Sequence, residues 1–171
     1  DSCFRLRPNA ADGDCLFHAL AGAHLSRDGI RDTRRAVAAV RMGMKPAPRP
    51  NARRVVAALL QTPETRPYGI ALADRGLGAV SNGTYAALQC VTGMQAGEAE
   101  IRQWCAIHER RVLVVDSGGR LVRVDFRGAR TSRGTEDESK RLIERALRQG
   151  WIVLFKTPGH WRRIDGLATA Q

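Results

Sequence analysis

The sequence predicts an α+β domain in which helices come first and a small, mostly antiparallel sheet follows. Apolar residues recur at helical spacing through the first two thirds of the 171-residue chain, and short apolar runs separated by turns fill the last third. Hydrophobic residues make up 43% and charged residues 26%, as in ordinary globular proteins. We therefore expect one domain over residues 1–171. Because the chain opens with Asp1, we expect it to be a fragment of a longer polypeptide.

Six segments carry a helical pattern, and several of them begin or end at a residue that favours a helix terminus. An apolar run follows Cys15, Asn51 is suited to be an N-cap, and Thr135 precedes a first turn of three acidic residues. Gly93 and Gly150 close two of the segments. The predicted helices span 16–23, 31–41, 52–61, 82–91, 98–108 and 135–149.

Strand patterns begin after the fifth helix. The turn residues Ser117-Gly118-Gly119 separate the first two apolar runs, and Pro158-Gly159 separates the last two, so both pairs are expected to form hairpins. The three prolines within Lys45–Pro50 predict an extended surface loop between two helices. The predicted strands span 111–116, 121–126, 151–155 and 160–164.

The chain is strongly basic. Its net charge of +11 arises from 28 Lys and Arg against 17 Asp and Glu, and all but Lys45, Lys140 and Lys156 of the 28 are arginines. A basic surface suits polyanionic partners, but these arginines are scattered along the sequence and aromatic residues amount to only 5%. We therefore do not expect nucleic acid as a partner. No apolar run approaches the length of a membrane span.

Cysteine usage indicates a reducing, intracellular setting. Cys3, Cys15, Cys90 and Cys105 lack the paired spacing of a zinc site, and a chain of this length needs no disulfide framework. The histidines do not fall at metal-ligand intervals from them. We expect no metal ion and no other cofactor.

Cys15 and His160 are the residues best suited to carry chemistry. Asp12-Gly13-Asp14 leads into Cys15 at the start of an apolar helix, where the helix N-terminus should lower the pKa of the thiol. His160 follows a Pro-Gly turn on a predicted strand that can pack beside that helix. A Cys at a helix start with a His on a strand is the arrangement of papain-like thiol hydrolases. The alternative is a buried cysteine and a structural histidine.

The segment Asp12–Leu20 (DGDCLFHAL) resembles the nucleophile motif Asp-Gly-Asn-Cys-Leu-Phe-Arg-Ala of the ovarian-tumour (OTU) family of cysteine proteases. Gly159-His160-Trp161 is similar to the family's C-terminal motif, a catalytic His followed by an aromatic residue. Between them, Gly97–Ile101 and then Arg111–Val115 resemble its helix-then-strand pattern. The resemblance covers most of the chain in order and implies the papain-like OTU fold, with helices packed on a small mostly antiparallel sheet.

The resemblance also implies roles for single residues. Cys15 would be the nucleophile and His160 the general base and acid. Asp12 matches an aspartate often counted in the active site, and its loop would help to form the oxyanion hole. Trp161 would pack beside the histidine and flank the substrate channel. Asp14 stands where the motif has Asn, and a carboxylate there should raise the pKa of the thiol.

The third member of a catalytic triad is left open by the sequence. Many family members place an acidic or amide residue two positions after the histidine, but here Arg162 cannot accept a hydrogen bond. Orientation of His160 must then come from elsewhere. Asp12, Asn9 and Asp165 are the candidates, in that order.

The implied function is a deubiquitinase that cleaves (iso)peptide bonds after the C-terminal glycine of ubiquitin or a ubiquitin-like protein. The partners would be ubiquitin or ubiquitin chains, and we expect a monomer. The arginine-rich, lysine-poor composition favours a microbial effector acting in the cytoplasm of a host cell, with a viral domain next and an ordinary cellular deubiquitinase third. The alternatives are a catalytically silent OTU-like binding module and a viral polyprotein-processing cysteine protease.

Overall fold

The structure, a computed structural model, describes residues 4–9, 12–60 and 82–167. A six-stranded sheet in the order β1-β6-β5-β2-β3-β4 runs through it. The pair β2–β5 is parallel and the other four pairs are antiparallel, so the mostly antiparallel sheet is confirmed. The strands are β1 (Phe4–Leu6), β2 (Val112–Asp116), β3 (Arg120–Asp125), β4 (Gly128–Arg133), β5 (Ile152–Thr157) and β6 (His160–Leu167).

All six predicted helices are present. They are α1 (Cys15–Ala21), α2 (Arg27–Arg41), α3 (Ala52–Leu60), α5 (Asn82–Gln89), α6 (Glu98–His108) and α7 (Glu136–Arg148). The second begins four residues earlier than predicted, because the Ser26 hydroxyl accepts a hydrogen bond from the Gly29 amide at 3.0 Å and caps it. Within the described ranges, no helix has both the length and the hydropathy that crossing a membrane requires.

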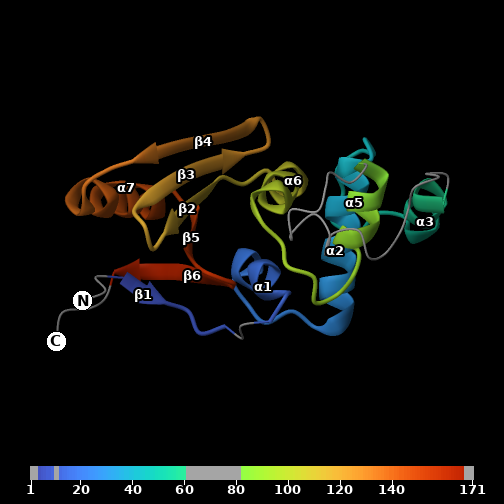
Figure 1. Cartoon of the computed structure of the whole chain (residues 1–171), viewed down its shortest axis with the longest axis horizontal. Helices are drawn as coiled ribbons and strands as arrows, with labels where there is room; N and C mark the ends of the chain where they lie inside the picture. Colours follow the sequence, from blue (N-terminus) through green and yellow to red (C-terminus); the bar gives the residue numbers. More distant parts are fainter. Residues whose placement is uncertain (1–3, 10–11, 61–81, 168–171) are drawn as a thin grey trace.

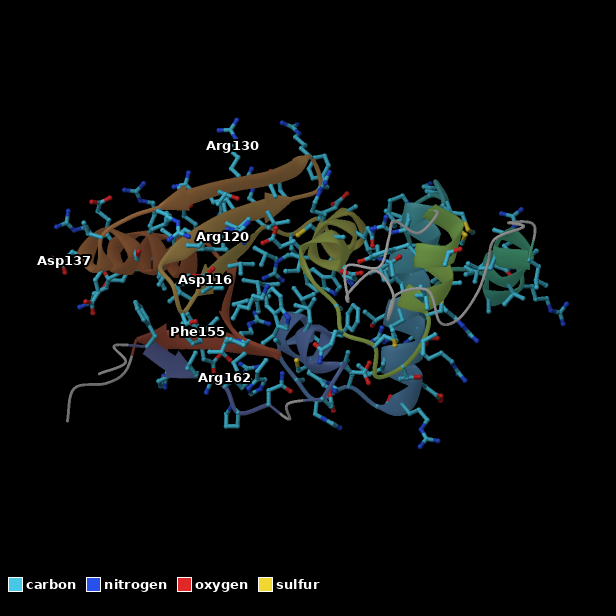
Figure 2. The ribbon with its side chains drawn as sticks, viewed as in Figure 1. Asp116, Arg120, Arg130, Asp137, Phe155 and Arg162 are labelled. Carbon is cyan, nitrogen blue, oxygen red and sulfur yellow. The ribbon has the colours of Figure 1, made fainter. Side chains whose placement is uncertain are left out.

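Two strands were not predicted. The strand β1 is only three residues long, and it is recognisable only through its pairing with β6. The strand β4 has the sequence GARTSR and is almost wholly exposed, so it lacks the alternation of apolar residues that marks a half-buried strand. Figure 2 shows β4 as the outer strand of a hairpin with β3, marked by the side chains of Arg130 and Arg120.

The two faces of the sheet carry different helices. One face, with Val114 and Leu154, joins the apolar cluster that includes side chains of α1 and α6. The other face, with Leu113 and Val153, packs against Ile143 of α7. In Figure 1 the sheet and α7 lie at one end of the molecule, α2, α3 and α5 lie at the other, and α1 and α6 lie between them. The helix α1 contacts β5 and β6, which brings its N-terminus to the start of β6.

Candidate active site

Cys15 is the first residue of α1 and lies against the beginning of β6. Its side chain is only 1% exposed. The backbone of Trp161, the residue after His160, lies close enough to the Cys15 thiol to lower its pKa, and the Asn9 side chain donates to the carbonyls of both residues. The structure therefore brings the helix start and the histidine strand together, as the sequence predicted for this pair of segments.

The pKa of Cys15 is raised above that of an ordinary thiol, and the predicted lowering is wrong in its net direction. Burial is the largest cause, because it disfavours the charged thiolate. Backbone hydrogen bonds from Trp161 and from the first residues of α1 lower the pKa, as expected of a helix start, but burial outweighs them. Because its pKa is raised, Cys15 is a neutral thiol at neutral pH. It therefore needs a base to react as a nucleophile.

His160 is the first residue of β6 and its ring is held by the main chain of Asn9. The Nε2 atom lies 3.0 Å from the Asn9 carbonyl oxygen. A carbonyl oxygen can only accept, so this contact assigns the proton to Nε2. In the neutral ring Nδ1 is then the acceptor, which is the form that a general base needs.

The Asn9 side chain ties together the two segments that carry Cys15 and His160. Its Nδ2 donates to the Cys15 carbonyl at 2.8 Å and to the Trp161 carbonyl at 3.0 Å. Asn9 thus contributes a carbonyl to the histidine and an amide to both neighbouring backbones. The sequence named it only as the second candidate for orienting the ring.

The other candidates for orienting His160 have different partners. The Asp12 carboxylate accepts a hydrogen bond from the Asp14 amide at 2.9 Å. Asp165 forms an ion pair with Arg7 at 2.5 Å. The guanidinium of Arg162 lies 5.9 Å from the centre of the Phe155 ring. Whether Asp12 takes part in catalysis stays a prediction.

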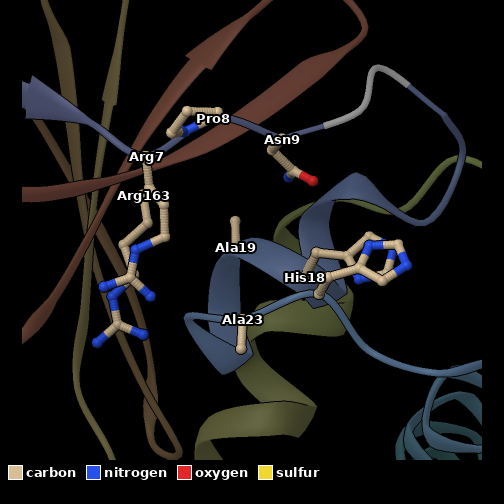
Figure 3. A pocket seen from close by; sticks show the side chains of 8 residues that line it. Arg7, Pro8, Asn9, His18, Ala19, Ala23 and Arg163 are labelled. Carbon is tan, nitrogen blue, oxygen red and sulfur yellow. The ribbon is translucent and has the colours of Figure 1, made fainter.

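A cavity of about 350 Å³ opens beside Asn9, between the N-terminal segment and α1 (Figure 3). Arg7 and Arg163 stand on one side of it, and His18 stands on the other. The ring of His18 stacks on that of His24 with 4.5 Å between the ring centres. The positive charge on this side of Asn9 therefore comes from Arg7 and Arg163, because burial lowers the pKa of His18.

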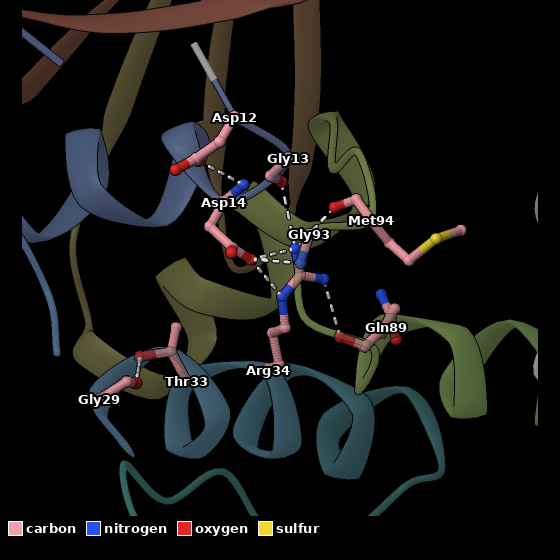
Figure 4. A network of polar contacts seen from close by, with 9 residues as sticks. All are labelled: Asp12, Gly13, Asp14, Gly29, Thr33, Arg34, Gln89, Gly93 and Met94. Atoms are coloured by element: carbon pink, nitrogen blue, oxygen red, sulfur yellow. Dashed lines mark hydrogen bonds and ion pairs between the residues drawn. The ribbon is translucent and has the colours of Figure 1, made fainter. Parts of the chain in front are cut away.

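Asp14, the departure from the family motif, is neutralised by a buried arginine that the sequence analysis missed. Arg34 of α2 is 1% exposed, and its Nε donates to Asp14 Oδ1 at 2.8 Å (Figure 4). The Gly93 amide donates to the same oxygen at 3.0 Å. The expectation that Asp14 raises the pKa of the thiol is not met, because the carboxylate that does so is Asp12.

The remaining hydrogen bonds of Arg34 hold the loop before Cys15 against the α5–α6 connection. The acceptors are three backbone carbonyls, those of Gly13 at 3.1 Å, Gln89 at 3.1 Å and Met94 at 2.6 Å. One signal could have found this residue. Arg34 lies at helical spacing between Ile30 and Val37 on the apolar stripe of α2, where a solvated arginine is out of place.

Gly13 permits the closest approach in this loop. A Cβ atom at this position would lie 1.6 Å from the Gly93 carbonyl oxygen, so no larger residue fits without moving the backbone. The loop is also closed by its own hydrogen bonds. The Cys15 amide donates to the Asp12 carbonyl at 3.2 Å, and Asp12 Oδ1 engages the Asp14 amide. The amides of Asp14 and Cys15, which could otherwise donate to an oxyanion, are thus already hydrogen-bonded to Asp12.

The other predicted residue, Trp161, lies in the core. Its side chain is 3% exposed, so contact with a substrate stays a prediction. Two further cysteines are described, and burial raises the pKa of both, that of Cys105 to about 12. Cys15 is set apart by its backbone hydrogen-bond donors. Among the described residues, no three His, Cys, Asp or Glu side chains come together as a metal-binding group.

No protein-family model matches the chain, and no curated protein sequence matches it. Solved structures do match. An OTU deubiquitinase from Wolbachia pipientis wMel bound to ubiquitin aligns with a TM-score of 0.52 and 12% identity, covering 96% of each chain. Another structure of an OTU deubiquitinase from Wolbachia pipientis wMel gives a TM-score of 0.50 with 12% identity, covering 97% of this chain and 90% of that one.

A viral OTU domain protease from Taggert virus aligns with a TM-score of 0.52 and 11% identity, covering 98% of this chain and 83% of that one. At such low identity the likeness concerns the fold. The chain has the OTU fold, which confirms the fold implied by the resemblance of its motifs.

Proposed function

We propose that this chain is a thiol-dependent deubiquitinase that hydrolyses the (iso)peptide bond after the C-terminal glycine of ubiquitin or a ubiquitin-like protein. One observation carries the proposal. On an OTU fold, the Cys15 thiol lies against the backbone of Trp161, while the adjacent His160 ring is held by Asn9 in the tautomer that a base requires. We place its action in a reducing compartment, the host cytoplasm if the chain belongs to an effector or a virus.

The proposed reaction has two stages. The Nδ1 atom of His160 takes the proton of the Cys15 thiol, and the sulfur bonds to the carbonyl carbon of the scissile bond. The C–N bond breaks, the leaving amine takes the proton from His160, and a thioester remains. Water then gives a proton to His160 and attacks the thioester, and the sulfur leaves and is reprotonated. Because the pKa of Cys15 is raised, we expect proton transfer to accompany attack.

The loop before Cys15 would supply the oxyanion donors. The Asp14 amide becomes available when Asp12 releases it, and we expect substrate binding to cause that release. Asp12 is exposed and close enough for its charge to raise the pKa of Cys15. It is therefore the carboxylate that we expect to meet the arginine-rich tail of ubiquitin. Glu98 is less suited to this role, because it pairs with Arg120 at 2.9 Å.

A silent OTU-like module that binds ubiquitin without cutting it is the second candidate. It is favoured by the 1% exposure of Cys15 together with the raised pKa of the thiol, since both disfavour attack on a substrate. Arg162, which replaces an acceptor two residues after His160, points the same way.

The test is the intact mass after incubation with ubiquitin carrying a C-terminal propargyl group. We expect one ubiquitin adduct on the wild type, none on Cys15→Ala, and a strongly slowed reaction for His160→Ala. The matched control is Cys90→Ala, which removes another thiol and should still form the adduct. All variants are first checked for the wild-type melting temperature.

A folded wild type that forms no adduct would overturn the deubiquitinase proposal for ubiquitin. Probes built on ubiquitin-like proteins then decide whether another modifier is the substrate. Binding of unmodified ubiquitin without any adduct would support the silent module, and the absence of both would remove both candidates.

A further inference from the structure

Two arginines of β3 each lie directly opposite an arginine of β4, in the hairpin at the edge of the sheet opposite β1. The register places Arg120 directly opposite Arg133 and Arg123 directly opposite Arg130. Like charges in directly opposed positions of an antiparallel pair destabilise it. The hairpin therefore carries an electrostatic cost that a bound anion would relieve.

Only one of the two pairs has a counterion within the described part of the chain. The Arg120 guanidinium pairs with Glu98 at 2.9 Å. Among residues 4–9, 12–60 and 82–167, no carboxylate lies within 4.0 Å of Arg123 or Arg130. Asp125 lies on the same strand as Arg123, but its Oδ1 accepts the two amides of the following turn at 2.7 Å and 3.1 Å.

Arg123 and Arg130, the pair without a counterion among the described residues, line a groove. The helix α7 packs on β5 and β6, and beside it the β2–β3–β4 part of the sheet is hollowed by two cavities of about 520 Å³ and 220 Å³. Both cavities are lined by Arg123 and Trp151, so they adjoin. We call this the arginine groove, and its cationic and aromatic lining consists of Arg111, Arg123, Arg127, Arg130, Arg145 and Trp151.

We infer that the arginine groove binds the phosphate backbone of single-stranded nucleic acid. Guanidinium groups hold phosphates through two parallel hydrogen bonds, and a phosphate between Arg123 and Arg130 would neutralise their repulsion. The Trp151 ring, with the Arg111 guanidinium 5.7 Å from its centre, offers planar groups of the kind on which bases stack.

Other anionic partners fit the groove less well. A concave site between a helix and a hairpin admits a strand more readily than the flat surface of a bilayer. The arginine-rich tail of ubiquitin would be repelled, so the groove does not belong to the proposed active site. The arginines are scattered along the sequence, and it is the hairpin and the α7 packing that gather them.

The test measures fluorescence anisotropy of a labelled oligo-uridylate with the wild-type chain and with Arg130→Glu. We expect the variant to bind at least about tenfold more weakly, with a salt dependence shallower by about 0.7 in log–log slope for each phosphate that is no longer neutralised. The same change places Glu opposite Arg123, so the melting temperature should rise while binding falls. Arg123→Glu repeats the test from the partner strand.

The matched control is Arg53→Glu, the same charge reversal on an exposed residue of α3 outside the groove, which should bind like the wild type. Equal weakening by the control, or no oligonucleotide binding by the wild type, would overturn the inference. So would binding of poly-glutamate or phosphatidylserine vesicles without binding of the oligonucleotide. Cys15→Ala should bind the oligonucleotide as tightly as the wild type, because Cys15 lies outside the arginine groove. Binding or loss of binding in this experiment therefore does not decide the deubiquitinase proposal, which the ubiquitin probe tests separately.

Discussion

Replacing Arg34 with Met would remove the buried cation beneath the active-site loop while keeping much of the side-chain volume. The guanidinium is 1% exposed and makes an ion pair with Asp14, whose side chain is 14% exposed. It also donates to the backbone carbonyls of Gly13, Gln89 and Met94. The change therefore leaves a nearly buried carboxylate without its cation and three carbonyls without a donor.

Removing one partner of a buried ion pair costs about 3–5 kcal/mol of folding free energy. Asp14 keeps one hydrogen bond after the change, from the Gly93 amide at 3.0 Å, and it retains some contact with water. We therefore expect Arg34→Met to lower the free energy of unfolding by about 3 kcal/mol, the lower end of that range. Because the same loop carries Cys15, the rate of adduct formation should fall as well.

Urea unfolding at neutral pH measures this loss, read as a shift of the midpoint at an unchanged m-value. The second variant is Arg34→Met with Asp14→Asn, which removes the stranded charge. We expect the double variant to recover more than about 1 kcal/mol relative to the sum of the single changes. A loss below about 1 kcal/mol for Arg34→Met, or strict additivity of the two changes, would refute the reasoning.

Three further predictions concern the site. Since burial and the Asp12 charge raise the pKa of Cys15, its alkylation by iodoacetamide should keep accelerating into the alkaline range, and Asp12→Asn should shift that profile to lower pH. Gly13→Ala should cost about 1–3 kcal/mol of stability, because its Cβ meets the Gly93 carbonyl, as a thermal or urea melt can measure. Asn9→Ala removes two hydrogen bonds and should cost about 1–3 kcal/mol by urea melt, with slower adduct formation.

The first two of these predictions have a control within the chain. Cys105, with a pKa of about 12, should be alkylated far more slowly than Cys15 in the same peptide-mapping experiment, and the reverse order would contradict the prediction. Gly128→Ala, where no atom lies within 4 Å of the added Cβ, should melt like the wild type. For Asn9, a variant as stable and as reactive as the wild type would show that its amide does not hold the two segments together.

The helical part of the fold was predictable because its signals are local. Apolar spacing lies within each helix, Thr135 and Gly150 flank α7, and all six helices form. The edge strands were not predictable, because their pairing partners lie elsewhere in the chain. Arg130 and its neighbours on β4 read as a polar loop, and only hydrogen bonding to β3 makes them a strand.

The sequence predicted which two segments form the site, but not the residues that hold these segments in place. The pairing of the Cys15 and His160 segments followed from a motif and a turn, both visible in sequence. The direction of the pKa shift of Cys15 depends on burial, which a spacing argument does not measure. Asn9 contacts His160, 151 positions away, and Arg34 contacts Asp14, 20 positions away. No local sequence pattern predicts contacts of this kind.

The position of Asn9 has a consequence for how the site can be lost. It follows the three-residue strand β1, which lies at the edge of the sheet and, among the described strands, pairs only with β6. Short edge elements are the parts of a protein that open at the lowest free energy, well below global unfolding. Detachment of β1 would withdraw the Asn9 carbonyl from His160 and the amide from the Cys15 backbone, while the helices and five strands stay folded. The proposed activity would then disappear on warming before any global unfolding signal does.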